Sequence, residues 1–419
     1  MAKSENRKLV KNSAMLMAMN AAKILFPLIT LPYLTRVLSK PCYGVTVYVK
    51  SVMTYMQLIV DFGFMLSATK GIVNAAGERD QEHRVIRTVL SAKLLLTAAA
   101  FCVLLILSLA LPLLRENRIF TLLSFVPVAL SVFLMDFLFR GLERMEVVAA
   151  RFVIMRGIAT ALTFVFVRAD ADLLWIPVLD TIGTLIAIGM IFTQMHRLGY
   201  QIAFRAPFSD VWSSLKDSAV YFASSMASTS FNALNTILLG IMLSAEDVAY
   251  WGVCMQAVAA IQALYTPITE SLYPVMIKEK SLKRIRGMVK LFLPLIIIGC
   301  AAAWLLSDFG ITLISGKAYL PAADLFRKLV PLLFFSFFSV LFGWPTLGAV
   351  DLNVETSRTT VSAVLFQITG LLLLILFNIY SLTSIAIVRD LSEAVLFGLR
   401  FRCFWRNRWR FSDYEGVHP

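Results

Sequence analysis

The sequence has few charged residues, histidines and cysteines for its length. Only 16% of its 419 residues are Asp, Glu, Lys or Arg, and three are histidine; soluble domains are about a quarter charged. The five cysteines have no paired spacing, so neither disulfides nor a metal site is expected. The phosphate-binding pattern GxxxxGK[ST] is missing, so we do not expect bound ATP. No other cofactor is expected either.

Hydrophobic residues dominate what is present. They make up 59% of the chain, and the mean hydropathy is +0.77. This composition indicates an all-α integral membrane protein that crosses the bilayer many times. The net charge of +13 would suit nucleic acid, but the basic residues lie between apolar segments rather than in one domain. No nucleic-acid partner is therefore expected, whereas membrane lipids are.

About twelve apolar segments have the roughly 20 residues that a membrane-spanning helix needs. They are 13–37, 43–67, 90–111, 119–139, 147–167, 173–195, 217–240, 247–270, 288–314, 329–350, 359–378 and 380–399. Lys and Arg concentrate in alternate loops, so both termini are predicted to be cytoplasmic. Asn20 and Lys23 interrupt the first apolar segment, which favours an uncleaved span over a signal peptide.

The chain is predicted to consist of two related halves of about six helices each, residues 1–205 and 206–419. The sequence from Leu38 to Tyr43 is weakly repeated from Leu243 to Tyr250. Each copy follows a first span with polar interruptions and precedes a second one. Related halves of this kind are common in transporters. The basic, Trp-containing tail after the last span is expected to lie at the inner membrane interface.

Polar residues recur at spacings of three and four along spans one, two, seven and eight, which places each set on one helix face. A lysine deep in a span costs several kcal/mol (roughly 3) unless it faces a partner or water. Four such faces predict a water-filled substrate path between the halves, although the serines alone also suit helix packing. The candidate path residues are Asn20, Lys23, Thr30, Arg36, Lys50, Thr54, Gln57, Ser225, Asn232, Asn235 and Gln256.

Two acidic residues and two prolines on these spans are further candidates. Asp61 and Glu270 lie near the inner ends of spans two and eight, where they are either coupling sites for H⁺ or Na⁺ or simply solvated. Pro27 and Pro267 can kink helices and are candidate hinges. In span twelve, Arg389 and Glu393 are one turn apart, and this pair is expected to be structural.

Four short motifs lie in the first two spans, at Leu31–Arg36, Tyr43–Gly44, Asp61–Phe64 and Leu66–Thr69, and supporting runs lie at Arg140–Met145 and Pro267–Pro274. Together they resemble Wzx-type polysaccharide flippases. It implies the polysaccharide transporter branch of the multidrug/oligosaccharidyl-lipid/polysaccharide exporter superfamily, with two six-helix bundles around a cavity. One departure is Met65, where family members often carry Asn.

The resemblance implies a transporter rather than an enzyme. Its cargo would be an undecaprenyl-pyrophosphate-linked O-antigen or related repeat unit, moved from the inner to the outer leaflet of a bacterial inner membrane. Lys23, Lys50 and Arg36 would face the pyrophosphate. A polysaccharide polymerase and a chain-length regulator are candidate partners.

Two alternatives remain open at this point. An ion-coupled multidrug or cation antiporter of the same superfamily would favour acidic rather than basic residues in its cavity. A membrane-embedded polysaccharide polymerase or ligase would need a large outer loop, and the predicted outer loops are short.

Overall fold

The computed structural model describes residues 2–201 and 203–413, and within them every regular element is a helix. By its internal contacts the chain divides into two compact units, residues 1–229 and 230–419. We call them the N-terminal and C-terminal units. The protein is thus an all-α membrane protein, as its composition predicts.

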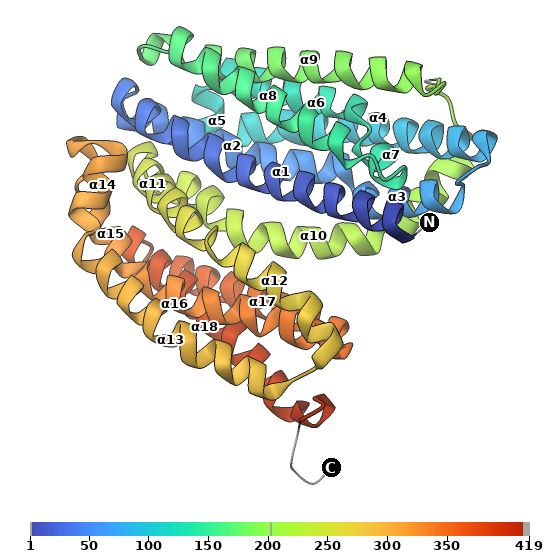
Figure 1. The fold of residues 1–419 in the computed structure, drawn as a ribbon. Helices are drawn as coiled ribbons and strands as arrows, with labels where there is room; N and C mark the ends of the chain where they lie inside the picture. The colour runs from blue at the N-terminus through green and yellow to red at the C-terminus, as the bar shows by residue number, and fades with distance from the viewer. Residues whose placement is uncertain (1, 202, 414–419) are drawn as a thin grey trace. The chain divides into compact units, whose positions relative to one another are not determined.

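The N-terminal unit packs long helices against one another, and α1, α8 and α9 lie side by side (Figure 1). Helix α2 packs against α4 and α6, while α3 packs against α7. The helices are α1 (Ala2–Val37), α2 (Lys40–Asp61), α3 (Phe64–Asn74), α4 (Arg79–Ala110), α5 (Pro112–Glu116), α6 (Arg118–Leu130), α7 (Asp136–Gly141), α8 (Met145–Phe166) and α9 (Trp175–Arg197), with short 3₁₀ turns at Ser131–Leu134 and Asp170–Asp172.

Helix α10 (Phe208–Met242) belongs to both units. Its first part packs on the turn between α2 and α3, where Phe62 stacks on Phe222 with ring centroids 4.4 Å apart. Ser67 and Ser218 share a hydrogen bond of 2.6 Å at the same place. The compact division therefore falls inside a continuous helix, later in the chain than the expected boundary at residue 205.

The C-terminal unit has an aromatic core where α16 and α18 pack together. Phe337, Phe342 and Phe404 are buried there, with the Phe342 and Phe404 ring centroids 5.1 Å apart. The helices are α11 (Ala245–Gln262), α12 (Tyr265–Glu279), α13 (Leu282–Leu305), α14 (Ser307–Ser315), α15 (Ala322–Lys328), α16 (Val330–Leu341), α17 (Asn353–Leu376) and α18 (Leu382–Arg406), with a π-helical turn at Gly343–Leu347 and 3₁₀ turns at Lys317–Tyr319, Gly348–Val350 and Arg408–Arg410.

Ten helical segments of the described residues are long and apolar enough to cross a membrane, so the protein is multi-pass. They are Ala14–Val37, Lys40–Asn74, Arg79–Ala110, Arg118–Gly141, Met145–Phe166, Asp170–Arg197, Ala245–Glu279, Leu282–Leu305, Val330–Val350 and Asn353–Leu376. The two other expected spans, 217–240 and 380–399, are helical as parts of α10 and α18. Helix α10 is too polar to count among the ten segments because it contains many serines and asparagines. Helix α18 is excluded because it has charged residues near its centre.

The second and eighth expected spans share two local features. Each begins after a serine that caps the helix: Ser39 accepts from the Cys42 amide, and Ser244 from the Asp247 amide. A side-chain oxygen at this position satisfies a free N–H of the first helical turn. Each span is also interrupted before its end, at 62–63 and at 263–264. The weak repeat in the sequence thus corresponds to similar local structure in the two units.

Candidate functional site

The candidate site begins at the sharp turn that ends α2. Phe62 and Gly63 both have positive φ, 40° and 79°, so the helix is interrupted directly after Asp61 before it continues as α3. A Cβ on Gly63 would lie 2.7 Å from the Cβ of Tyr221 and 2.9 Å from the Phe222 nitrogen. Glycine is therefore required here both for its backbone conformation and for the close approach of α10. The turn fixes the position of the Asp61 carboxylate.

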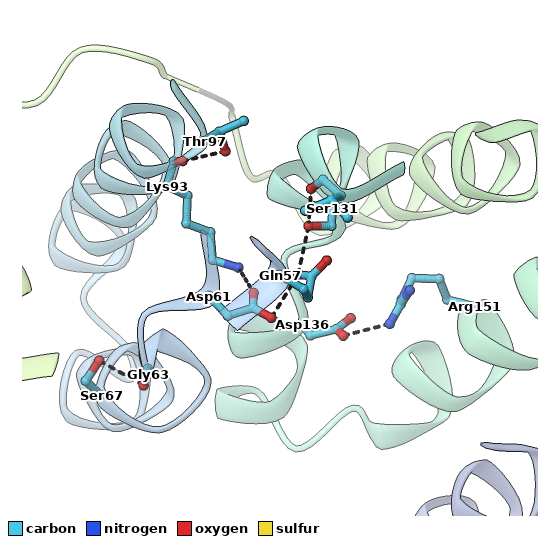
Figure 2. A network of polar contacts seen from close by, with 10 residues as sticks. Gln57, Asp61, Gly63, Ser67, Lys93, Thr97, Ser131, Asp136 and Arg151 are labelled. Atoms are coloured by element: carbon cyan, nitrogen blue, oxygen red, sulfur yellow. Dashed lines mark hydrogen bonds and ion pairs between the residues drawn. The ribbon is translucent and has the colours of Figure 1, made fainter. Parts of the chain in front are cut away.

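Asp61 lies at the centre of a polar network inside the N-terminal unit (Figure 2). Lys93 on α4 donates to its Oδ1 at 2.7 Å, and Gln57 on α2 donates to its Oδ2 at 2.9 Å. The same Gln57 nitrogen lies 3.0 Å from the Ser131 hydroxyl. Charge-assisted bonds of this kind are the stronger ones. Three separate segments of the unit are thus connected through one carboxylate.

A second ion pair joins Asp136, at the start of α7, to Arg151 on α8, with 2.6 Å between Oδ2 and Nη2 (Figure 2). The Arg151 side chain is 5% exposed. Lys93 and Asp61 lie within electrostatic range of Asp136, so the two pairs form one cluster. A buried pair that loses one partner leaves an expensive isolated charge. The cluster therefore constrains four helices together.

Lys23 on α1 lies close to this cluster. Arg140, Asp136 and Arg151 are all within electrostatic range of it, and its Nζ lies 5.8 Å from the centre of the Phe152 ring. We call the full set the N-terminal ionic cluster: Lys23, Asp61, Lys93, Asp136, Arg140 and Arg151. Four cations here face two carboxylates, so the cluster has excess positive charge.

Lys50, the second lysine of the predicted path, has different neighbours. Arg156 on α8 and Asp180 on α9 are within electrostatic range of it, and they form an ion pair of 2.9 Å with each other. Both paired side chains are more than a third exposed. Two cations again face a single carboxylate, so positive charge is also in excess at this second place in the unit.

The other predicted path residues of the N-terminal unit occupy helix surfaces of mixed exposure. The Thr30 and Thr54 hydroxyls donate to the carbonyls of Phe26 and Lys50 one turn earlier. The remaining candidates differ in exposure. The half-buried ones are Asn20, Thr30 and Ser225, and the exposed ones are Arg36 and Thr54. The threonines satisfy their hydroxyls locally, as is common in membrane helices.

In the C-terminal unit, Asn235 is fully buried and accepts a hydrogen bond of 3.4 Å from Gln367 on α17. Asn232 is exposed, and Gln256 on α11 is half-buried. The side chain of Glu270 lies outside the part of the chain that the structure describes. These residues stay a prediction for the transport path.

The two predicted hinge prolines occupy different kinds of position. Pro27 lies inside the continuous helix α1, where it removes one backbone hydrogen bond. Pro267 lies in the first turn of α12, directly after the interruption at 263–264, where a proline is well tolerated. Their role as hinges stays a prediction.

Sequence analysis missed Lys93, Arg151, Arg156 and Asp180. The sequence feature that could have identified them is a single charged residue surrounded by mostly apolar ones, as for Lys93 in the run from Leu90 to Thr97. Such a residue within a span needs a partner. No group of His, Cys, Asp or Glu in the searched part of the chain is arranged to hold a metal ion.

A cavity of about 310 Å³ lies beside the turn at Gly63, lined by α3, α4 and the start of α10. Arg84 and Asp210 form an ion pair of 3.0 Å in its wall. Its polar lining includes Ser67, Thr88, Ser213, Ser214 and Asp217. Hydroxyl and carboxylate groups at this density can hydrogen-bond a polyhydroxylated ligand.

A family model described as "Polysaccharide biosynthesis protein" matches residues 9–279. The chain belongs to this family. A relative from Escherichia coli strain K12, whose name proposes an O-antigen transporter, is 26% identical over 90% of both chains. Another from Shigella dysenteriae, with the same name, is 27% identical over 63% of this chain and 66% of its own.

Solved structures show that this family member has the fold of MATE transporters. One inward-facing multidrug resistance MATE transporter of the MOP superfamily matches with a TM-score of 0.63 and 11% identity, over 94% of this chain and all of that one. A Vibrio cholerae MATE transporter matches with a TM-score of 0.59 and 13% identity, over 97% and 99% of the two chains. At these identities the likeness concerns the fold alone.

Proposed function

We propose that this protein is a transporter that moves a lipid-linked oligosaccharide across the bacterial inner membrane. The cargo is an O-antigen or related repeat unit on undecaprenyl pyrophosphate, and movement is from the inner to the outer leaflet. Family membership and the two relatives named as O-antigen transporters support the class of cargo. The MATE-like fold supports transport rather than an enzymatic reaction.

The single observation that carries the proposal is the excess positive charge in the N-terminal unit. Four cations face two carboxylates in the N-terminal ionic cluster, and two face one around Lys50. A pyrophosphate is a compact anion that such groups bind through charge-assisted hydrogen bonds. Lys23 is the member with the most exposed position, since Lys93 and Arg151 are buried in ion pairs.

The transport cycle in this proposal is alternating access. The glycan headgroup enters from the cytoplasmic side, where both termini lie, and the polyprenyl tail stays in lipid. Lys23, Lys50 and Arg36 attract the pyrophosphate, and the polar residues of spans one, two, seven and eight form hydrogen bonds to sugar hydroxyls. Pro27 and Pro267 permit bending. A polysaccharide polymerase and a chain-length regulator then receive the cargo in the outer leaflet.

A multidrug or cation antiporter is the second candidate, because the similar solved structures include multidrug transporters. A cationic cargo would be repelled by the N-terminal ionic cluster, since like charges in a low dielectric are strongly unfavourable. A polymerase is disfavoured because the segments predicted to be outer loops are short.

The test is deletion of the gene in its native host, with complementation by wild-type protein or the Lys23→Ala variant at equal expression. We expect deletion to abolish surface glycan and to accumulate the lipid-linked intermediate at the inner leaflet. Lys23→Ala should reduce transport about tenfold or more, because a hydrogen bond to a charged group is worth about 1.5–3 kcal/mol. Surface polysaccharide on gels and leaflet-resolved assay of the intermediate are the measurements.

Two variants serve as controls. Lys23→Arg keeps the charge and should retain most activity, while Lys216→Ala removes an exposed lysine on α10 that lies near the Trp212 ring and should have no effect. Normal surface glycan after deletion would refute the flippase assignment. Full activity of Lys23→Ala would refute the role of the cationic cluster.

A further inference from the structure

Helix α18 buries three adjacent ionisable residues inside the C-terminal unit. Arg389 donates to Glu393 at 2.8 Å, and the two side chains are 3% and 6% exposed. The guanidinium also lies 4.2 Å from the centre of the Phe231 ring. Arg389 thus has a carboxylate on one side and an aromatic face on another, both of which stabilise its charge.

Asp390 lies next to this pair without a cation of its own. It is 9% exposed, and its buried Oδ1 atom has no hydrogen-bond partner among the described residues. The polar groups that act on its carboxyl are Arg389, Glu393 and the backbone N–H of Leu332 at the start of α16. One of these is a like charge, and the guanidinium already bonds Glu393.

Among the described residues, the helices packed against α18 supply no further counter-ion, and the part of α10 from Phe231 to Met242 has no titratable side chain. Helix α16 and the turn Gly343–Leu347 contain no titratable side chain. On α15, Arg327 pairs with Asp308 at 2.6 Å and Lys328 donates to Thr383 at 2.9 Å. Arg400 on α18 donates to Ser339 and Thr360, and its charge acts on Glu393.

The charged residues of helix α17 lie far from the part of this helix that contacts α18 near Asp390. Gly370 contacts α18 at Val388, two residues before Asp390. The titratable residues of α17, Glu355 and Arg358, lie at least twelve residues earlier, which is roughly 18 Å along the helix axis. Arg389 is thus the one cation among the described residues that acts on the Asp390 carboxyl, and it already bonds Glu393. A buried carboxylate with so little compensation is expensive in a low dielectric, and a bound proton removes that cost.

We propose that Asp390 is a proton-binding site whose loading and release couple transport to the proton gradient. The coupling part rests on the proposed function, whereas proton binding by the site does not. We assign a proton because Oδ1 is buried without a hydrogen-bond partner, and a bound proton needs no set of oxygen ligands, whereas a metal cation does. The site belongs to the C-terminal unit, whereas the N-terminal ionic cluster belongs to the other unit.

The first test uses infrared spectroscopy on the purified full-length protein in lipid nanodiscs at neutral pH. Exposed carboxyls are ionised under this condition. We expect a protonated-carboxyl C=O band in wild type, its loss in Asp390→Asn, and a shifted band in Asp390→Glu. Asp324→Asn, which removes an exposed carboxylate of the same unit, should leave the band unchanged.

A wild-type spectrum without a protonated-carboxyl band would overturn the proposal, as would a band that survives in Asp390→Asn. If sodium chloride removes the band at constant pH but choline chloride does not, the site binds a metal cation and the proton assignment is wrong. The absence of the band in wild type, or its removal by sodium, overturns the proposal even if a variant fails to fold.

The second test measures transport of fluorescent undecaprenyl-pyrophosphate-linked glycan in proteoliposomes, with and without a proton gradient. The gradient should stimulate wild type several-fold and leave Asp390→Asn unaffected. Equal stimulation of both would overturn the coupling. If wild type moves no glycan at all, the proposed function fails while the infrared result still decides the proton site.

Discussion

The two units of this protein bury ionisable groups in opposite ways. In the N-terminal unit the charges come from several helices, cations outnumber carboxylates, and Asp61 is still 34% exposed. In the C-terminal unit they come from one helix, α18, and the Arg389–Glu393 pair is almost fully enclosed. Two cations, Arg389 and Arg400, face two carboxylates, Asp390 and Glu393, so there is no excess of positive charge.

The difference has a physical consequence for each unit. A cross-helix cluster with excess positive charge holds helices together and offers a partly open place for an anion. A cluster on one helix contributes little to holding helices together, because its partners are already a turn apart in the sequence. Its enclosed, uncompensated carboxyl suits the small cation that the inference above assigns to it.

The largest effect is expected from breaking the enclosed pair of the C-terminal unit. Glu393→Leu leaves the Arg389 charge buried with Phe231 and without its bonded carboxylate. We expect a loss of about 4 kcal/mol in the free energy of unfolding, measured by thermal unfolding in detergent. The double variant Arg389→Met/Glu393→Leu should recover most of the lost stability. If the double variant is destabilised as much as Glu393→Leu alone, the buried Arg389 charge is not the cause of the loss.

A smaller loss in the free energy of unfolding is expected for Lys93→Met in the N-terminal unit. Asp61 is partly exposed and keeps its bond from Gln57, so the cost should be about 3 kcal/mol. Here the double variant Lys93→Met/Asp61→Leu should recover less than the C-terminal one, because Gln57 then loses a partner. If both double variants recover wild-type stability fully, the cluster shared between helices and the cluster on one helix do not differ in the way described.

Two glycines sharpen the same comparison. Gly63→Ala combines a positive φ with a contact of 2.7 Å to Tyr221, and we expect it to cost about 2 kcal/mol. Gly370→Ala in α17 would meet only the tip of Val388 at 2.9 Å, and the better helix propensity of Ala offsets this contact. Thermal unfolding of both variants is the measurement, and a larger loss for Gly370→Ala would show that the turn at Asp61 is not the constrained site.

The smallest effect on stability is expected from a change at Asp413, near the exposed C-terminal end of the C-terminal unit. Partial burial raises the pKa of Asp413, but hydrogen bonds from the Lys283 and Leu282 amides and the Ser281 hydroxyl outweigh it and lower this pKa. Because folding lowers the pKa, the contribution of Asp413 is complete above the pKa of the unfolded chain and is lost as pH falls through the folded value.

Asp413→Asn should therefore cost about 1 kcal/mol at neutral pH, as for other helix caps, and less in acid. The measurement is thermal unfolding as a function of pH, with Asp351→Asn as an exposed control on the same unit. A difference between Asp413→Asn and wild type that grows toward low pH would contradict the assigned hydrogen bonds.

Much of the fold could be predicted because hydrophobic length and polar interruption are local properties. The segment from 217 to 240 was expected to span, and α10 covers it, yet its serines and asparagines make it too polar to be recognised by hydropathy alone. The cluster around Asp61 could be predicted only in part. Asp61 and Gln57 share one helix face, whereas Lys93 reaches them from a helix 32 residues later in the chain.

The sequence by itself determined that this chain is an all-α membrane protein with positive charges placed within its spans, because the cost of exposing polar backbone and charge to lipid depends on composition. Only the tertiary structure decided which charges neutralise one another. Lys93 binds Asp61, Arg151 binds Asp136, and the Oδ1 atom of Asp390 has no hydrogen-bond partner among the described residues. The energy of a charge depends on distances and burial between helices, which spacing along the chain does not specify.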